Sequence, residues 1–185
     1  MTSKSVSSKG EQDRGTPKSF IEKVNNLYPL IFDLAASKQN SKCGKNFFSI
    51  KENSLNQDWA QLYSQMGGKG FFWLNPPFCA PTRKCEKDCK KKKCIERGFH
   101  NEIDQPGISA WMEKCVLESK NGAKIATLTL ATRGTVWYRK WVRPNALSLI
   151  LGKRIIFEGE TTPFTRELML NIFGTGMTGE GYLDI

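Results

Sequence analysis

A rare tetrapeptide follows the apolar run 71–74 and combines residue types that could hold the amino group of a nucleobase: Asn75-Pro76-Pro77-Phe78. The side-chain oxygen of Asn75 and the carbonyl oxygen of Pro76 can each accept one N–H of an exocyclic amine, which frees a lone pair otherwise delocalised into the ring. Both prolines fix φ and lack an N–H that would compete for the amine. The ring of Phe78 could stack on a base that has left the duplex. A strand that simply ends in a Pro-Pro turn is the alternative.

A cluster of cysteines comes directly after this tetrapeptide, at Cys79, Cys85, Cys89 and Cys94, and His100 follows it. Thiols spaced this closely are typical of a tetrahedral zinc site. None of the spacings is the Cys-x-x-Cys of a common zinc ribbon, so free cysteines in a basic loop, or cysteines buried as small apolar side chains, are the alternative. In a metal site, His100 could replace Cys79, which lies close to the tetrapeptide.

Positive charge is concentrated in the same segment and in a second stretch further along the chain. The first group would grip phosphates beside a flipped nucleotide, and its contribution should fall steeply with salt. A solvated loop whose charge serves solubility is the alternative. Arg133 begins the second stretch, whose aromatic residues could be core or stacking platforms. The residues that we predict to contact nucleic acid are Lys90, Lys91, Lys92, Lys93, Arg97 and Arg133.

The composition agrees with a polyanionic partner. The 185 residues carry a formal net charge of +10 and have a pI of about 9.4, which favours DNA or RNA, although an excess of surface lysine would give the same numbers. No stretch approaches the roughly 20 apolar residues of a membrane span, and residues 1–9 lack the apolar core of a signal peptide. We therefore expect a cytoplasmic protein without a membrane contact, whose cysteines are reduced or metal-bound.

Hydrophobic periodicity predicts strands that alternate with helices, which indicates an α/β sheet covered on both faces. Thr16 is expected to cap the first helix, with Pro17 at its first position. Residues 1–14 should be a disordered tail and residues 174–185 a glycine-rich tail. The predicted helices span 17–27, 108–119 and 136–142, and the predicted strands span 30–34, 71–74, 125–130, 146–151, 154–157 and 168–173.

Ligands of open α/β sheets bind at the carboxyl ends of the strands, and two predicted strands end in residues suited to this. One end carries Asn75. The other carries Asp33, which is followed by small residues that would let the backbone approach a ligand, although an Asp that caps a helix would look the same. The glycine pair in 173–176 resembles a cofactor loop, but no helix and acid follow it at the required distance.

Several blocks resemble, in order, the phage-type DNA N-6-adenine methyltransferase family, which is related to Dam. The similarity covers roughly residues 15–173, and the shared order of the blocks makes it specific. The blocks are Thr16-Pro17-Lys18-Ser19-Phe20, Phe32-Asp33-Leu34-Ala35-Ala36-Ser37, the stretch from Asn40 to Phe48, Ser54-Leu55 with Asp58-Trp59, Asn75-Pro76-Pro77-Phe78, Trp111-Met112-Glu113-Lys114, the stretch from Leu128 to Trp137, and Gly152-Lys153-Arg154-Ile155-Ile156-Phe157.

The resemblance implies a Rossmann-like, S-adenosylmethionine-dependent methyltransferase sheet in a single domain, 15–173, with a basic, cysteine-rich insert at 79–106. It also implies DNA as the partner and S-adenosylmethionine as the methyl donor, and we expect a monomer. The common glycine loop of methyltransferases is absent after the strand at 30–34. Carried over by residue, the catalytic set is Asn75, Pro76, Pro77 and Phe78, and the cofactor set is Thr16, Pro17, Asp33, Ala35, Ala36, Ser37 and Asp58.

Two hypotheses of different classes follow. The first is methyl transfer to N6 of adenine in the cytoplasm of a bacterium or a phage-infected host, with N4 of cytosine as the runner-up because the tetrapeptide suits both amines. The second is a non-catalytic nucleic-acid-binding zinc protein on a methyltransferase fold. Asp33-dependent binding of S-adenosylmethionine would distinguish them.

Overall fold

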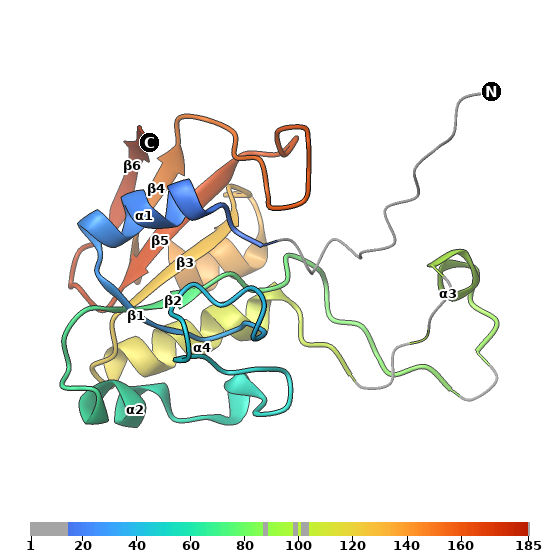
Figure 1. Ribbon diagram of the computed structural model, residues 1–185, viewed down its shortest axis with the longest axis horizontal. Coiled ribbons are helices and arrows are strands. Elements are labelled where there is room, and N and C mark those ends of the chain that lie inside the picture. Colours follow the sequence, from blue (N-terminus) through green and yellow to red (C-terminus); the bar gives the residue numbers. More distant parts are fainter. Residues whose placement is uncertain (1–14, 87–88, 98–99, 101–103, 185) are drawn as a thin grey trace.

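The computed structural model describes residues 15–86, 89–97, 100 and 104–184, and these form one six-stranded sheet with helices on both faces (Figure 1). The strand order is β1-β2-β3-β5-β4-β6. The strands are β1 (Leu30–Asp33), β2 (Phe71–Leu74), β3 (Ile125–Leu130), β4 (Ala146–Leu151), β5 (Leu168–Phe173) and β6 (Gly179–Leu183).

The helices divide between the two faces of the sheet. Of the helices in the described part of the chain, only α1 (Lys18–Leu27) covers one face, in front of the strands in Figure 1. The other face is covered by α2 (Trp59–Gln65), α4 (Ile108–Lys120) and η2 (Tyr138–Val142, a π-helix). The short η1 (Ser54–Asn56) precedes α2, and α3 (Lys92–Arg97) lies apart from the sheet in the cysteine-rich insert (Figure 1).

Alternation along the central strands separates two apolar cores. In β3, Ile125 belongs to the cluster under α4, whereas Ala126 and Leu128 belong to the cluster under α1. The same alternation holds in β2, where Phe72 and Trp73 point to opposite faces. Strands that are buried on both faces need apolar side chains at nearly every position, which explains why these segments were recognisable in the sequence.

The prediction of an α/β sheet covered on both faces is confirmed, and five strands and the helix at 108–119 lie where the pattern placed them. The predicted strand at 154–157 is wrong. Its apolar residues Ile155 and Phe157 pack against the α1-face core from a loop instead of pairing in the sheet. The sequence analysis also missed α2 and η1, which are only seven and three residues long.

Two chain ends differ from the prediction. Thr16 does not cap α1: the N-cap is Pro17, whose carbonyl accepts the N–H groups of Phe20 and Ile21 at 3.1 Å each. Residues 174–185 are not simply a tail, because β6 pairs in parallel with β4 at the edge of the sheet. Glu180 fastens β6 to the body by accepting the Tyr138 hydroxyl at 2.8 Å. The predicted tail at 1–14 lies outside the described residues.

Strand direction decides which ends of the strands meet. β1, β2 and β3 are parallel, and β5 is antiparallel to both β3 and β4. β4 therefore runs in the same direction as β1–β3. The carboxyl ends of all four strands lie along the same side of the sheet, which we call its carboxyl edge. The residues that follow β1 and β2 come out at this edge, beside one another. No helix among the described residues is long and apolar enough to cross a membrane.

A buried carboxylate joins the two helices that underlie β1 and β2. Glu118 of α4 is 3% exposed, and it accepts the N–H of Ala60 at the start of α2 at 2.7 Å and pairs with Lys114 at 2.6 Å. It thereby satisfies one of the backbone donors that every helix start leaves without an intrahelical partner.

We expect Glu118→Gln to lower the free energy of unfolding by about 1–3 kcal/mol, because Lys114 would keep a largely buried ammonium without its counter-charge. Urea unfolding followed by circular dichroism measures this. Glu113→Gln, on the exposed side of the same helix, is the matched control. Equal unfolding midpoints for the two variants would contradict the assigned role of Glu118.

Candidate active site and metal centre

Asn75 is held in a defined orientation by the segment before α1. It follows the last residue of β2, and its Nδ2 donates a hydrogen bond to Oγ1 of Thr16 at 3.2 Å. Thr16 is 1% exposed, so this acceptor is fixed in the protein interior. Because the amide N–H is used in this way, Oδ1 faces away from Thr16 and can accept a hydrogen bond. None of the hydrogen bonds among the described residues uses Oδ1 of Asn75 or the Pro76 carbonyl.

The rest of the tetrapeptide is partly built into the core. Pro76 is buried, and Pro77 and Phe78 are half-buried. Phe78 packs against the α1-face core, so part of its ring surface is already covered. The structure places Thr16 beside Asn75, a contact that the sequence analysis did not predict, and it gives Thr16 a role different from the predicted helix cap.

Asp33, at the end of β1, organises the loop that follows it. Its Oδ1 accepts the N–H of Ala35 at 3.3 Å, and its Oδ2 accepts the N–H of Lys42 at 2.9 Å. The side chain is 2% exposed, and burial raises the pKa of its carboxyl from an ordinary 3.8 to about 6, against the opposing effect of the two backbone hydrogen bonds. The site therefore holds a carboxylate whose charge is incompletely compensated.

The predicted cofactor residues after Asp33 lie in this folded loop. The N–H of Ala36 donates to Phe48 O at 3.0 Å, and the N–H of Ser37 donates to Oδ1 of Asn40 at 2.6 Å. Asp58 was predicted to contribute from a neighbouring strand end, and the structure corrects that placement. It precedes α2 rather than following a strand, and it caps this helix by accepting the N–H of Gln61 at 2.8 Å.

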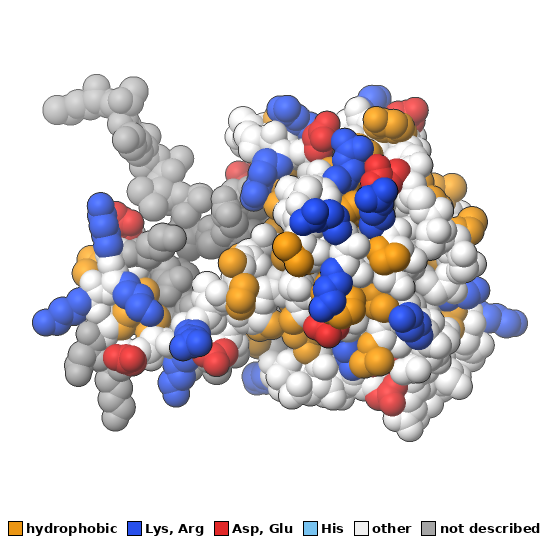
Figure 2. Space-filling view, turned by 180° about the vertical axis from the view of Figure 1, so that it is seen from behind, with side chains coloured by type: hydrophobic (Ala, Val, Ile, Leu, Met, Phe, Trp, Pro, Cys, Tyr) orange, Lys and Arg blue, Asp and Glu red, His pale blue; other side chains and the backbone are white. Residues whose placement is uncertain are grey.

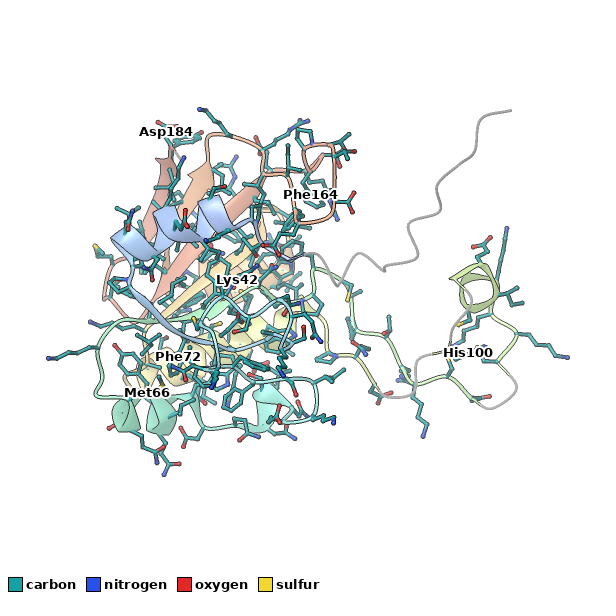
Figure 3. All side chains as sticks on the ribbon, in the orientation of Figure 1. Lys42, Met66, Phe72, His100, Phe164 and Asp184 are labelled. Atoms are coloured by element: carbon teal, nitrogen blue, oxygen red, sulfur yellow. The ribbon has the colours of Figure 1, made fainter. Side chains whose placement is uncertain are left out.

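Two residues that sequence reasoning missed close the same region. Lys42 pairs with Glu158 at 2.8 Å, and the N–H of Glu158 donates to Gly15 O at 2.9 Å. Lys42 is labelled on the body in Figure 3, and its side chain is only 12% exposed. A contact across 116 positions leaves no local pattern, so only the fold could show that the loop after β4 is fastened beside Asp33.

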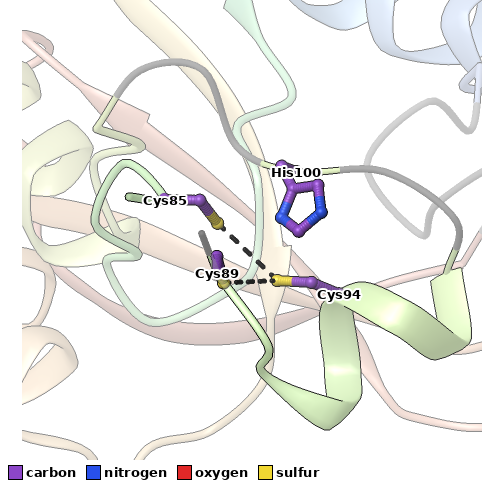
Figure 4. A group of neighbouring side chains, drawn as sticks. All are labelled: Cys85, Cys89, Cys94 and His100. Atoms are coloured by element: carbon purple, nitrogen blue, oxygen red, sulfur yellow. Dashed lines mark hydrogen bonds between the residues drawn. The ribbon is translucent and has the colours of Figure 1, made fainter. Parts of the chain in front are cut away.

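The cysteine-rich insert contains a compact group of metal-ligand side chains: Cys85, Cys89, Cys94 and His100 (Figure 4). Their ligand atoms all lie within 4.8 Å of one another. Sγ of Cys94 is 3.6 Å from Sγ of Cys85 and 3.7 Å from that of Cys89. Tetrahedral zinc with Zn–S bonds of about 2.3 Å separates its sulfurs by about 3.8 Å. The donor set and its spacing therefore fit zinc.

Cys79 is not part of this group, so the predicted set of four cysteines is corrected to three cysteines and His100. The reason is the neck of the insert. The Cys79 carbonyl accepts the N–H of Ile108 at 3.0 Å, and Thr82 and Gln105 exchange backbone hydrogen bonds at 2.7 and 3.0 Å. These bonds hold Cys79 at the body, whereas His100 lies in the insert beside α3, away from the sheet (Figure 3).

The lysines predicted to contact DNA lie in the same insert as this group. Lys90, Lys91 and Lys92 are exposed, and Lys92 pairs loosely with Glu96 at 3.8 Å. The side chains of Lys93 and Arg97 lie outside the described residues. Figure 2 shows Lys and Arg on the outer surface of the insert and over the body seen from behind. The charge of the insert is therefore presented to solvent.

The second basic stretch has a more structural character. Arg133 donates to Oε2 of Glu180 at 3.2 Å, so a phosphate would compete with this carboxylate. Of the aromatic residues, Tyr138 is 1% exposed, and Trp137 and Trp141 are half-buried against the α4-face core. Tyr138 is therefore a core residue and not a stacking platform, the two possibilities that the sequence left open.

The comparison with known families fits this geometry. A model described as DNA N-6-adenine-methyltransferase (Dam) matches residues 3–166. The chain belongs to this family. The match includes both strand ends and the whole insert, and the fold, a mixed α/β structure with a six-stranded sheet, is compatible with a methyltransferase. The resemblance to phage-type relatives of Dam that the sequence suggested is confirmed.

Two members of the family are similar over much of the chain. A DNA N-6-adenine-methyltransferase of Escherichia phage T1 is 28% identical over 144 residues, 75% of this chain and 53% of the phage protein. One of Haemophilus phage HP1 is 25% identical over 123 residues, 65% of this chain and 66% of its own length. The chain thus spans between half and two thirds of these relatives. No solved structure matches it.

Burial of Asp33 should make stability depend on pH. Since its pKa is about 6 in the folded protein and 3.8 ordinarily, the folded state binds the proton more tightly. Its contribution to stability is complete below about pH 4 and is lost as pH rises to 6, by as much as about 3 kcal/mol. We expect Asp33→Asn to remove this loss, so that wild type weakens relative to the variant between pH 4 and 7.

Urea unfolding at several pH values measures the difference between the two proteins. Asp58→Asn, which removes an exposed carboxylate and keeps a good helix cap, is the control. Parallel stability curves for wild type and Asp33→Asn would show that the folded protein does not hold this proton.

Proposed function

We propose that this protein transfers a methyl group from S-adenosylmethionine to the exocyclic N6 amine of adenine in DNA, on a Rossmann-like methyltransferase sheet. The observation that carries the proposal is the orientation of Asn75 by Thr16 at the carboxyl end of β2, one strand away from the buried Asp33. Membership of the Dam family and the names of the two phage relatives support adenine as the base.

The amine would be recognised by two oxygens. Oδ1 of Asn75 and the Pro76 carbonyl, which accept no hydrogen bond from the described residues, would each accept one N–H of the base. Holding both hydrogens localises the nitrogen lone pair and aims it in one direction, which is a positioning effect. The same dipoles stabilise the positive charge that develops on the nitrogen. The exposed part of the Phe78 ring would stack on the flipped base.

The cofactor region fits a cationic ligand. Asp33 is buried with incomplete compensation, and the nearby ammonium of Lys42 is already paired with Glu158. The ammonium of the methionine moiety would supply the missing positive charge. Residues 35–37 and Thr16-Pro17 would lie beside it, and Asp58 is not required. S-adenosylmethionine, when bound, would supply the methyl carbon. The bond from this carbon to sulfur would break as the bond to the amine nitrogen forms, and the methylated amine would lose a proton to water.

The insert would serve DNA binding rather than chemistry. We propose that Cys85, Cys89, Cys94 and His100 hold a structural zinc ion, because their spacing matches tetrahedral ligation. Four protein ligands leave no open position for catalysis. The ion would fold the head of the insert and present Lys90, Lys91 and Lys92 to the phosphates beside the target base, and the neck at Thr82 and Gln105 would fix its distance from Asn75.

Methylation is the direct test of the function. Purified protein is incubated with S-adenosylmethionine and unmethylated DNA, and the digested nucleosides are separated by mass spectrometry. We expect N6-methyladenine from wild type and none from Asn75→Ala. Thr16→Val should reduce kcat by roughly 10- to 100-fold, since it frees the amide to rotate. Thr16→Ser, which keeps the acceptor, should retain most activity.

The outcomes separate the alternatives. N4-methylcytosine as the product would keep the mechanism and overturn the choice of base. No methylated base on duplex or single-stranded DNA, together with no S-adenosylmethionine binding by calorimetry, would overturn the enzyme. Asn56→Ala, an exposed residue of η1, controls for unspecific effects of substitution. Equal activity of Thr16→Val and wild type would remove Thr16 from the site.

Metal content tests the zinc proposal. We expect zinc in equimolar amount with the chain, and cobalt(II) substitution should give the absorption of a tetrahedral thiolate site. Cys89→Ser should lose the metal and weaken DNA binding, whereas Cys79→Ser, outside the group, should keep both. Affinity for S-adenosylmethionine should be the same in both variants. Absence of metal from protein prepared with added zinc would sink the proposal.

A further inference from the structure

A recess with a cavity volume of about 150 Å³ lies where β4 ends and β5 begins, apart from the zinc group and from the proposed catalytic and cofactor residues. Segment 151–154 forms one wall and segment 166–168 the other. Of the lining side chains, three are cationic and one is acidic: Lys153, Arg154, Arg166 and Glu167.

The cations of the recess are available to a ligand. Lys153, Arg154 and Arg166 are all exposed, and none of them forms an ion pair with a described residue. Two acids border the recess, Glu167 in its lining and Asp184 beside Gly152. Three cations against these two acids leave a net positive surface, suited to an anion of low charge.

The loop beside the recess is held in place by packing contacts and a backbone hydrogen bond. The guanidinium of Arg166 lies over the ring of Phe164, 5.6 Å from its centroid. Phe164 in turn packs edge-on against the buried Phe157, and its N–H donates to Ile155 O at 2.9 Å. Phe164 is labelled in this loop in Figure 3. An Arg fixed in this way loses less freedom on binding, and its planar fork matches phosphate oxygens.

Topology places the recess at the functional edge of the sheet. β4 runs in the direction of β2, so its carboxyl end lies on the same side as Asn75. Three strand spacings separate the two strands, and β3 extends three residues past the level at which β2 ends. At about 4.8 Å per strand and 3.3 Å per residue, the recess lies on the order of 15–20 Å from Asn75, roughly half a turn of duplex.

We propose that this recess binds one backbone phosphate of the DNA about half a helical turn from the target base. The inference rests on the proposed function, and it adds a second anchor to the lysines of the insert. Two anchors on different elements would fix the register of the duplex on the carboxyl edge while the target base is flipped. Phosphate contacts of this kind position the DNA without reading its sequence.

The test is the salt dependence of DNA binding by the zinc-loaded full chain, using a 30-base-pair duplex. Removal of one phosphate contact should lower the slope of log Kd against log salt by about 0.9. We expect this for Arg154→Gln with Arg166→Gln, together with a roughly tenfold weaker Kd at low salt and a higher KM for DNA. The kcat at saturating DNA should be unchanged, because neither residue touches the reacting atoms.

The matched control removes the same charge from the opposite edge of the sheet. Lys69 precedes β2 and Lys120 ends α4 before β3, and both are exposed. Lys69→Gln with Lys120→Gln should leave slope and KM as in wild type. If both double variants lower the slope equally, the effect is one of net charge, and the recess has no specific role.

A neutral methylphosphonate, moved along the duplex one position at a time, locates the contact. Wild type should lose affinity at a position about half a turn from the target, and the recess variant should lose nothing further there. If the methylphosphonate and the recess substitutions each lower the affinity for DNA, and their effects add at every position of the duplex, the proposal is overturned. If wild type methylates DNA but the recess variant keeps the wild-type salt slope, only the phosphate site in the recess is overturned. If wild type does not methylate DNA, the proposed function is overturned.

Discussion

Parallel pairing of β1 with β2 is the constraint on which the site depends. Asp33 stands opposite Trp73 in the register, and the N–H of Leu34 donates to Trp73 O at 2.8 Å. This pairing carries the chain after both strands out of the same edge, a strand spacing apart. Because successive side chains of a strand point to opposite faces of the sheet, a slip of one residue would turn Asp33 to the other face. The cores beneath α1 and α4 prevent such a slip.

The loops at this edge are held by a few long-range polar contacts rather than by regular structure. Asp33 holds the loop up to Lys42, Lys42 reaches Glu158, and Glu158 is bonded to Gly15 beside the acceptor of Asn75. A change in the charge of Asp33 would therefore be felt along the whole series. This arrangement gives a physical route by which occupation of the proposed cofactor region could affect the orientation of the amide at the proposed base site.

The insert needs another source of stability, because residues 79–106 have few apolar side chains and cannot form a core of their own. Its neck is tied by backbone pairing at Thr82 and Gln105, and its head gathers three thiols and an imidazole. Metal ligation would replace the missing apolar core. A basic head on a fixed neck can be placed beside the tetrapeptide without altering the sheet.

The sequence by itself determined the buried strands, α4, the tetrapeptide and the basic cysteine-rich segment, because periodicity and local spacing record burial and short-range chemistry. It could not decide between Cys79 and His100, place Asp58 at a helix start, or reveal that Thr16 orients Asn75. Ile155 and Phe157 looked like strand residues because apolar runs record burial and not hydrogen-bond partners. Only the tertiary structure decided these points, since each depends on which distant backbone segments the sheet brings to one edge.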